Sequence, residues 1–261
     1  MRLLCYKRKG SAGFTLIELL IAMVITMIIV GAIYSAYKSQ QDSYLAQEQV
    51  AETQQNLRVA LVFLTNDIRM AGFDPTSTGN PTIVSASSGA IHITKDSTGG
   101  ESDGDDNDED GTTDESDEST YGDGDTADAG EDVQYGLSDD DNSNGIADSL
   151  EAGTQGASDD DHSDLGRDTG GGLQAIAENI DCIEFFYTMD DGTQTLTPPA
   201  ANLDDIRAVE VSILARANHM DREFNNNITY TTASGDTWGP FNDNYRRRFV
   251  SMTIQARNME F

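Results

Sequence analysis

The clearest chemical spacing in the chain lies in the stretch DDDNSNGIADSLE, residues 139–151. Counted from Asp140, an acid or amide side chain stands at positions one, three and five, and Gly145 follows at position six, where a calcium loop turns sharply. The candidate ligands are Asp140, Asn142, Asn144, the main-chain carbonyl of Ile146, Asp148 and a bidentate Glu151. Ca²⁺ binds about six to eight oxygens in a flexible shell, so the spacing predicts a Ca²⁺ site here.

A second stretch, DNDEDGTTDESD at 106–117, repeats the spacing. Its candidate Ca²⁺ ligands are Asp106, Asp108, Asp110, Asp114 and Asp117. The twelfth position is Asp rather than Glu, which shortens the last ligand and resembles dockerin or thrombospondin type 3 loops. The alternative is chance, because spaced acids arise easily in an acidic stretch and most charge runs are simply solvated.

Both loops lie in a strongly acidic segment. Residues 96–166 contain 26 Asp or Glu and no Lys or Arg, in a chain whose formal net charge is -30. Like charges and few apolar residues predict that this insertion, taken as 96–168, is not ordered without metal. The charge favours cationic partners and disfavours nucleic acid.

A different acidic residue interrupts the most apolar part of the chain. Basic residues at positions 2–9 precede an apolar run from Phe14 to about Tyr37, whose only charge is Glu18. At about 1.5 Å per residue the run makes a helix of about 36 Å, enough to cross a hydrocarbon core of about 30 Å. A carboxylate inside a bilayer costs about 3 kcal/mol, so Glu18 is either paired and functional or reaches the interface.

The helix is expected to continue well beyond the span. Residues 14–71 contain no proline and a single glycine, which predicts about 58 helical residues, or nearly 90 Å. Residues 14–37 form the transmembrane and assembly half and 38–72 an amphipathic half that packs on a head. Gly72 and Pro75 mark the end of the helix.

Four later segments alternate in the manner of β-strands. They are residues 82–94, 179–189, 205–217 and 247–259. The fold class is therefore α+β, with one antiparallel sheet of four or five strands in a head formed by residues 73–261, packed on the outer half of the helix.

The N-terminal stretch GFTLIELLIAMVI resembles the signal of type IV prepilins and pseudopilins, which has Gly, then Phe, then Glu at mature position five. The resemblance implies that a prepilin peptidase removes the leader 1–13 by cleaving between Gly13 and Phe14, and that the new amine of Phe14 is methylated. It also implies the ladle shape of pilins, and other pilin subunits as partners. A neighbouring subunit's amine then offers Glu18 an ion pair that fixes axial register.

The later segments look similar to PilW-type minor pilins. They are residues 57–75, 179–187, 206–216 and 242–258. The resemblance implies a structural minor pilin of a type IV pilus that takes part in assembly, in priming or in display at the tip. The resemblance also implies a single-pass inner-membrane protein before assembly. After assembly the protein is expected to be part of the pilus, in the periplasm or at the cell surface. Many major pilins have a helix-kinking proline and a C-terminal disulfide, and this chain has neither.

Two other functions remain open. A pseudopilin of a type II secretion system shares the signal, the helix and the sheet, and the acidic insertion could instead be a displayed binding module that contacts a surface or a tip adhesin. The three arginines at 246–248 could dock an acidic neighbour or the chain's own acidic insertion, or form a solvated strand end. An enzyme is not expected, because no motif joins a nucleophile to a base, and the isolated histidines disfavour zinc.

Overall fold

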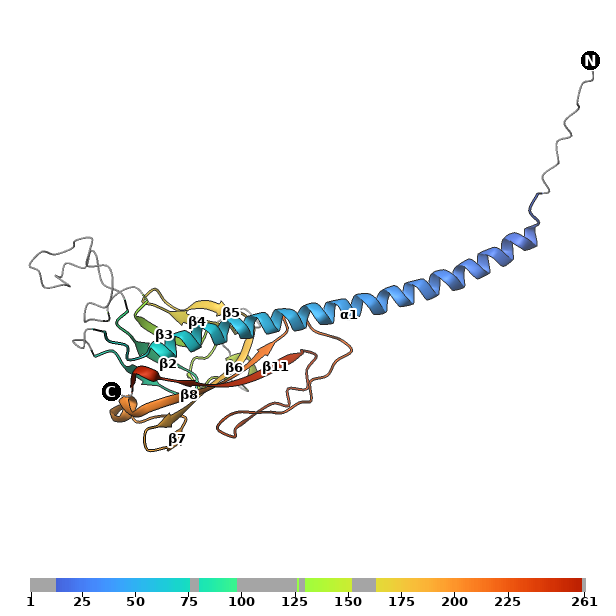
Figure 1. Ribbon diagram of the computed structural model, residues 1–261. Coiled ribbons are helices and arrows are strands. Elements are labelled where there is room, and N and C mark those ends of the chain that lie inside the picture. The colour runs from blue at the N-terminus through green and yellow to red at the C-terminus, as the bar shows by residue number, and fades with distance from the viewer. Residues whose placement is uncertain (1–12, 76–79, 98–125, 127–129, 152–162, 260–261) are drawn as a thin grey trace, which may run out of the picture. The chain divides into compact units, whose positions relative to one another are not determined.

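The computed structural model describes residues 13–75, 80–97, 126, 130–151 and 163–259. The long helix α1 (Leu16–Met70) contributes to two compact units, Met1–Glu48 and Gln49–Phe261. Figure 1 shows α1 followed by the strands of the second unit.

Two antiparallel sheets dominate the second unit. The first has the order β1-β2-β3-β4-β5, so each strand pairs with its neighbour in sequence. Its strands are β1 (Ile83–Ala86), β2 (Ile91–Thr94), β3 (Asp132–Leu137), β4 (Leu165–Asp168) and β5 (Gln174–Ala177).

The second sheet has the order β11-β8-β6-β7 and contains the longest strands. They are β6 (Ile180–Met189), β7 (Gln194–Thr195), β8 (Ile206–Arg216) and β11 (Arg247–Gln255). A separate ribbon pairs β9 (Tyr230–Thr231) with β10 (Thr237–Trp238). Short 3-10 helices are η2 (Asp148–Leu150), η3 (Ala200–Asp205) and η4 (Arg257–Met259).

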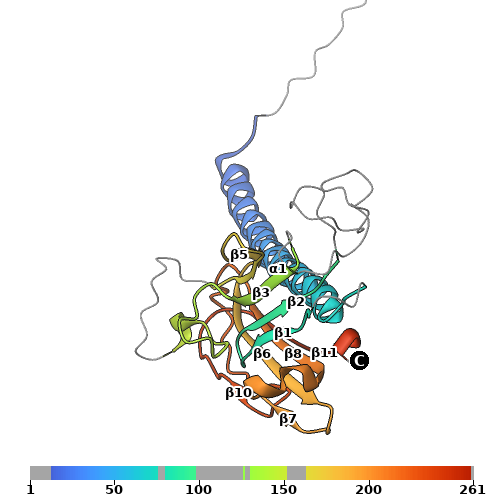
Figure 2. The ribbon, with the colours of Figure 1, turned by 90° about the vertical axis from the view of Figure 1, so that its left-hand side faces the viewer.

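One hydrophobic core joins both sheets to the end of α1. The buried face of α1 carries apolar residues about one helical turn apart, namely Leu57, Ala60, Leu64 and Ile68. They belong to the same buried cluster as residues of both sheets, and Figures 1 and 2 show this part of α1 beside the strands. The helix is amphipathic here because it covers a sheet surface, as its sequence predicts.

The end of α1 is fixed by its contact with the C-terminal 3-10 helix. Gly72 has φ +77°, a conformation that glycine adopts without strain. A β-carbon at this position would lie 2.7 Å from the sulfur of Met259. Asn258 donates a side-chain hydrogen bond of 3.0 Å to the carbonyl of Arg69, which satisfies one of the last carbonyl groups of the helix.

The sequence-based fold class is confirmed, with two corrections. The four strand segments are all present, and the first of them folds as the expected β1-β2 hairpin. The head contains two principal sheets rather than one, since β3, β4 and β5 extend the hairpin. The expectation that residues 96–168 bury too little apolar area to be ordered is wrong for β3 and β4, where apolar residues such as Val133, Tyr135 and Leu165 enter the core.

Candidate functional site

Glu18 lies in the first turn of α1, where it forms a reciprocal cap with Thr15. The main-chain N–H and the hydroxyl of Thr15 each donate to Glu18 Oε2, at 2.9 Å in both cases. The N–H of Glu18 donates in return to Thr15 Oγ1 at 3.4 Å. This is the capping box Thr-x-x-Glu, and it explains why α1 begins at Leu16 rather than at Phe14. The sequence TLIE at residues 15–18 is the signal for this cap.

The surroundings of Glu18 are apolar and uncovered. Phe14 is 91% exposed, and large aliphatic side chains from Leu16 to Ile33 are also exposed. An 18-residue window of α1 has a mean hydropathy of 2.8 and none of it is buried, so α1 is long and apolar enough to cross a membrane. Such a surface requires lipid or other protein to cover it.

The loop from Asp140 to Glu151 is closed by its own side chains. Asp140 Oδ2 accepts the N–H of Gly145 at 2.7 Å, and Asn144 Oδ1 accepts the N–H of Ile146 at 2.8 Å. The amide nitrogens of Asn142 and Asn144 donate to the two carboxylate oxygens of Glu151, at 3.1 and 2.5 Å. The twelfth residue of the loop therefore contacts its third and fifth residues.

A tight main-chain contact fixes this loop to the head. The N–H of Ile183 in β6 donates to the carbonyl of Gly145 at 2.8 Å. Gly145 has φ +87°, and a β-carbon there would lie 2.0 Å from the carbonyl oxygen of Ile183. On the other side, a β-carbon at Gly89, in the β1-β2 turn, would lie 2.1 Å from the nitrogen of Gly145. Only glycine fits at either position.

The ionised carboxylate of Asp140 is destabilised where it lies. Burial raises the pKa of Asp140, and repulsion from Asp148 adds to the effect, while the N–H groups of Gly145 and Asn144 oppose it. The side chain of Asp148 is buried. A cation between these groups would reverse both effects, and the mix of carboxylates, amides and a carbonyl suits the hard oxygen shell of Ca²⁺.

The second predicted loop lies outside the described residues. This applies to Asp106, Asp108, Asp110, Asp114 and Asp117. Within the ranges that the structure does describe, no three His, Cys, Asp or Glu side chains form a group that could hold a metal. The loop at 140–151 depends on two amides and a carbonyl for half of its expected ligands.

A polar cluster that sequence analysis missed ties α1 to the first sheet. Asp67 is 5% exposed. Its carboxylate accepts hydrogen bonds from Arg167 Nε at 2.8 Å, the hydroxyl of Tyr135 at 2.5 Å and Lys95 Nζ at 3.2 Å. Asp67 falls on the same helical stripe as Leu64 and Ile68, and an acid on a buried stripe was a signal that it needs partners.

Comparisons with known proteins follow the same division of the chain. Residues 8–34 match the family model of the prokaryotic N-terminal methylation motif. Residues 132–258 match the family model of type IV pilus-assembly protein W. Together the two models cover more than half of the sequence.

Comparison with solved structures finds a type IV-like pilin from Thermus thermophilus. It is 12% identical, with a TM-score of 0.40, and the match covers 79% of this chain and 96% of that one. No curated protein matches the chain significantly.

Proposed function

Because residues 8–34 match the prokaryotic N-terminal methylation motif and residues 132–258 match type IV pilus-assembly protein W, we propose that the chain is a PilW-type minor pilin. It enters a type IV pilus as a minor subunit that primes assembly or is displayed near the tip. The observation that carries this proposal is the coupling of a prepilin motif to a helix with an uncovered apolar surface. That apolar surface is removed from water first by the inner membrane and then by other pilin helices in the filament.

The proposal is tested on the mature chain in its own cells. We expect mass spectrometry to find an N-terminus at Phe14 that carries a methyl group, and sheared filaments to contain the protein in small amounts. An N-terminus at Met1 would contradict processing. Loss of type II secretion with normal pili after gene deletion would favour the pseudopilin role instead.

The loop from Asp140 to Glu151 is proposed to bind Ca²⁺ and so to stabilise the head. Three features support this. The spacing of oxygen ligands is complete, Glu151 lies over the amides of Asn142 and Asn144, and burial disfavours the charge on Asp140. A ligand that binds only the folded state raises the melting temperature with its concentration.

Calcium titration of the full mature chain in detergent tests the loop. Asp140→Asn combined with Glu151→Gln should remove one Ca²⁺ from the stoichiometry and abolish the corresponding rise in melting temperature. Asp141→Asn is the matched control, because Asp141 is exposed and stands between ligand positions. Equal calcium binding by all three proteins would mean that the acidic run attracts cations without a site.

A further inference from the structure

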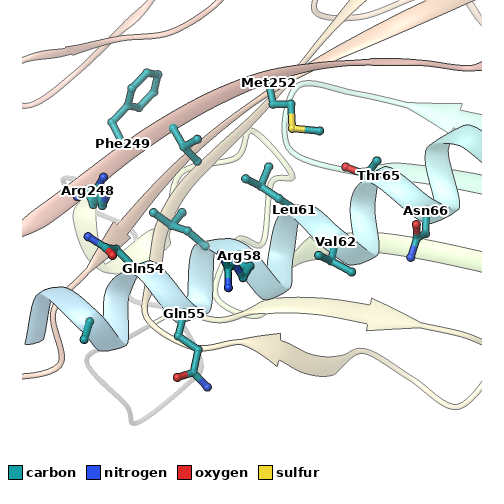
Figure 3. Close-up of a pocket in the computed structure, with 13 residues that line it drawn as sticks. Gln54, Gln55, Arg58, Leu61, Val62, Thr65, Asn66, Arg248, Phe249 and Met252 are labelled. Atoms are coloured by element: carbon teal, nitrogen blue, oxygen red, sulfur yellow. The ribbon is translucent and has the colours of Figure 1, made fainter. Parts of the chain in front are cut away.

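A long groove lies between α1 and the edge of the second sheet. It has a volume of about 840 Å³ and is lined by α1 residues 51–66 and by Arg248, Phe249, Val250 and Met252 of β11. Figure 3 shows side chains of the helix and of β11 lining it from two sides. A smaller hollow of about 80 Å³ shares Arg248 and is lined by Gln49, Val50, Thr53, Arg246 and Arg247.

The groove runs beside main-chain groups that can form another strand pair. β11 is the end strand of its sheet, so within the described residues no strand pairs with its outer edge. Ala217 donates to the carbonyl of Arg246 at 2.8 Å, and Ala256 donates to the carbonyl of Arg207 at 3.0 Å. Antiparallel bonding alternates, so the even-numbered residues of β11 bond to β8 and the odd-numbered ones, including Ser251 and Thr253, face outward.

Within the residues that the structure describes, no paired strand, proline or bulge protects the outer edge of β11. β11 has nine residues in regular register with β8, without proline or bulge. Natural edge strands are typically short, bulged or covered, because an open edge is a template for another strand. A long and regular edge next to a groove is the arrangement that binds an extended chain.

The charged side chains that line the groove and the hollow are all basic, and a carboxylate lies beside β11, that of Glu210, which accepts a hydrogen bond from the Ser251 hydroxyl at 3.0 Å. Four arginines and no Asp or Glu line the groove and the hollow, in a chain with 46 acidic and 16 basic residues. Arg246 pairs with Asp221 at 2.6 Å, and Arg247 pairs with Asp181 and Asp243 at 2.5 and 2.6 Å. Arg58 and Arg248 are exposed and form no ion pair within the described part of the chain.

We propose that the outer edge of β11 and its groove bind an extended, carboxylate-bearing strand from a different pilin-like subunit. Ser251 and Thr253 form main-chain hydrogen bonds with that strand, and Arg58 and Arg248 pair with its carboxylates. The segment from Arg248 to Met252 spans about 14 Å, enough for about four residues of a paired strand. The inference rests on the proposed function, since a filament supplies the neighbour.

The described strand edges of a second copy do not supply such a strand, which favours a different chain as the occupant. The other strands at the ends of the two sheets are β1 (IVSA), β5 (QAIA) and β7 (QT), which are short and contain no carboxylate. β11 (RRFVSMTIQ) has none either. A second copy also adds its own net charge of -30, which opposes self-association.

Proline at position 253 tests the main-chain edge. The N–H of Thr253 faces away from β8, so Thr253→Pro removes an outward donor and leaves the β11-β8 ladder, since proline is tolerated on the free side of an edge strand. We expect Thr253→Pro to lower the amount of protein in sheared filaments about tenfold, the effect of losing one or two hydrogen bonds and adding a clash. Thr253→Ala, which keeps the N–H, should incorporate normally. Circular dichroism melting of the full chain in detergent checks that both variants are folded.

A photo-crosslinking amino acid at position 253 identifies the occupant in whole cells. The expected adduct joins the chain to another subunit with a prepilin-type N-terminus. It should be lost in the Arg58→Glu, Arg248→Glu variant and kept in the Arg58→Lys, Arg248→Lys variant, which also tests the groove if the proline variant is unstable.

Normal incorporation of folded Thr253→Pro, or an adduct between two copies, would overturn the inference while leaving the pilin role intact. Absence of the wild-type chain from filaments would instead contradict the proposed function, and the crosslink in the membrane fraction would still report on β11.

Discussion

At the scale of single residues, Glu18 has a local role and an expected intersubunit one. Locally it closes the first turn of α1, with Oε2 accepting two hydrogen bonds from Thr15. These donors are neutral, so they do not compensate the charge of an ionised carboxylate in an apolar setting. The capping box offsets part of the desolvation cost, and the remaining charge still favours a cationic neighbour.

Three substitutions separate the two roles of Glu18. Glu18→Gln keeps the capping pattern and loses the charge, whereas Thr15→Ala keeps the charge and weakens the cap by about 1 kcal/mol. We expect Glu18→Gln and Glu18→Ala to insert in the membrane but to be depleted from filaments, and Thr15→Ala to incorporate almost normally. Immunoblots of membrane and filament fractions measure both steps. If Glu18→Gln incorporates like wild type, the charge does not set subunit register.

Asp67 is the other residue whose charge organises the structure. Burial by itself would raise the pKa of Asp67, but hydrogen bonds from Arg167 and Tyr135 and the charge of Lys95 hold it below its usual value. The unfolded chain therefore binds a proton at this group more readily than the folded chain does. Its contribution to stability is complete above the unfolded pKa of about 3.9 and is lost as the pH falls through the folded value.

Asp67→Asn should destabilise the head in a pH-dependent way. Removing one partner of a buried ion pair leaves Arg167 and Lys95 uncompensated, which costs about 3 kcal/mol. We expect the melting temperature of the variant to lie below that of wild type by a constant amount between about pH 5 and pH 8, and the gap to narrow below about pH 4. Melting curves of the mature chain in detergent measure the gap. A gap that widens in acid would contradict the assigned ionisation of Asp67.

At the scale of elements, the loop from Asp140 to Glu151 is held in the head by close main-chain contacts, to which the hydroxyls of Ser87 and Ser88 add hydrogen bonds. The β1-β2 turn lies on one side of Gly145 and β6 on the other, and β-carbons at Gly89 or Gly145 would overlap main-chain atoms. The loop therefore keeps its place in the head through main-chain bonds such as that from Ile183 to Gly145. Calcium would act on a loop whose ends are already positioned, which reduces the ordering cost of binding.

Gly145→Ala measures this contact. The change forces a β-carbon against the carbonyl of Ile183 and strains a left-handed backbone, so we expect a loss of at least about 2 kcal/mol in unfolding free energy. Gly192→Ala is the matched control, because Gly192 has φ +80° and no atom within 4 Å of the added carbon. That variant should lose only about 1 kcal/mol. Equal losses in denaturant unfolding would indicate that backbone strain, not loop packing, dominates at Gly145.

At the scale of the whole molecule, part of the acidic segment 96–166 belongs to the core of the head. Strands β3 and β4 lie inside the segment that its charge marks as an insertion, and Val133, Tyr135 and Leu165 are fully buried in the core. Removing all of residues 96–166 would therefore delete part of the core together with the acidic run. A test for an adhesive role must spare residues 130–151 and β4.

Replacing residues 98–125 with a short Gly-Ser linker provides that test. These residues include the predicted ligands from Asp106 to Asp117 and contain none of the strands that the structure describes. We expect the variant to melt close to the wild-type temperature, to enter filaments normally and to bind fewer calcium ions. Reduced surface adhesion with normal filaments would support the displayed binding module. Loss of filaments would show that the segment serves assembly itself.

The sequence by itself determined the long helix, its end at Gly72 and the α+β class, because these depend on local periodicity, turn residues and apolar runs that neighbours in the chain can specify. It also predicts a role for Glu18 and a Ca²⁺ site at the Asp140 loop, whose candidate ligands are close in sequence. Only the tertiary structure decided that the head has two sheets, that Asp67 pairs with Arg167 across 100 positions, and that β11 presents an open edge beside α1. These features depend on which distant segments pack together, and that choice is made by the shared core rather than by any one stretch of residues.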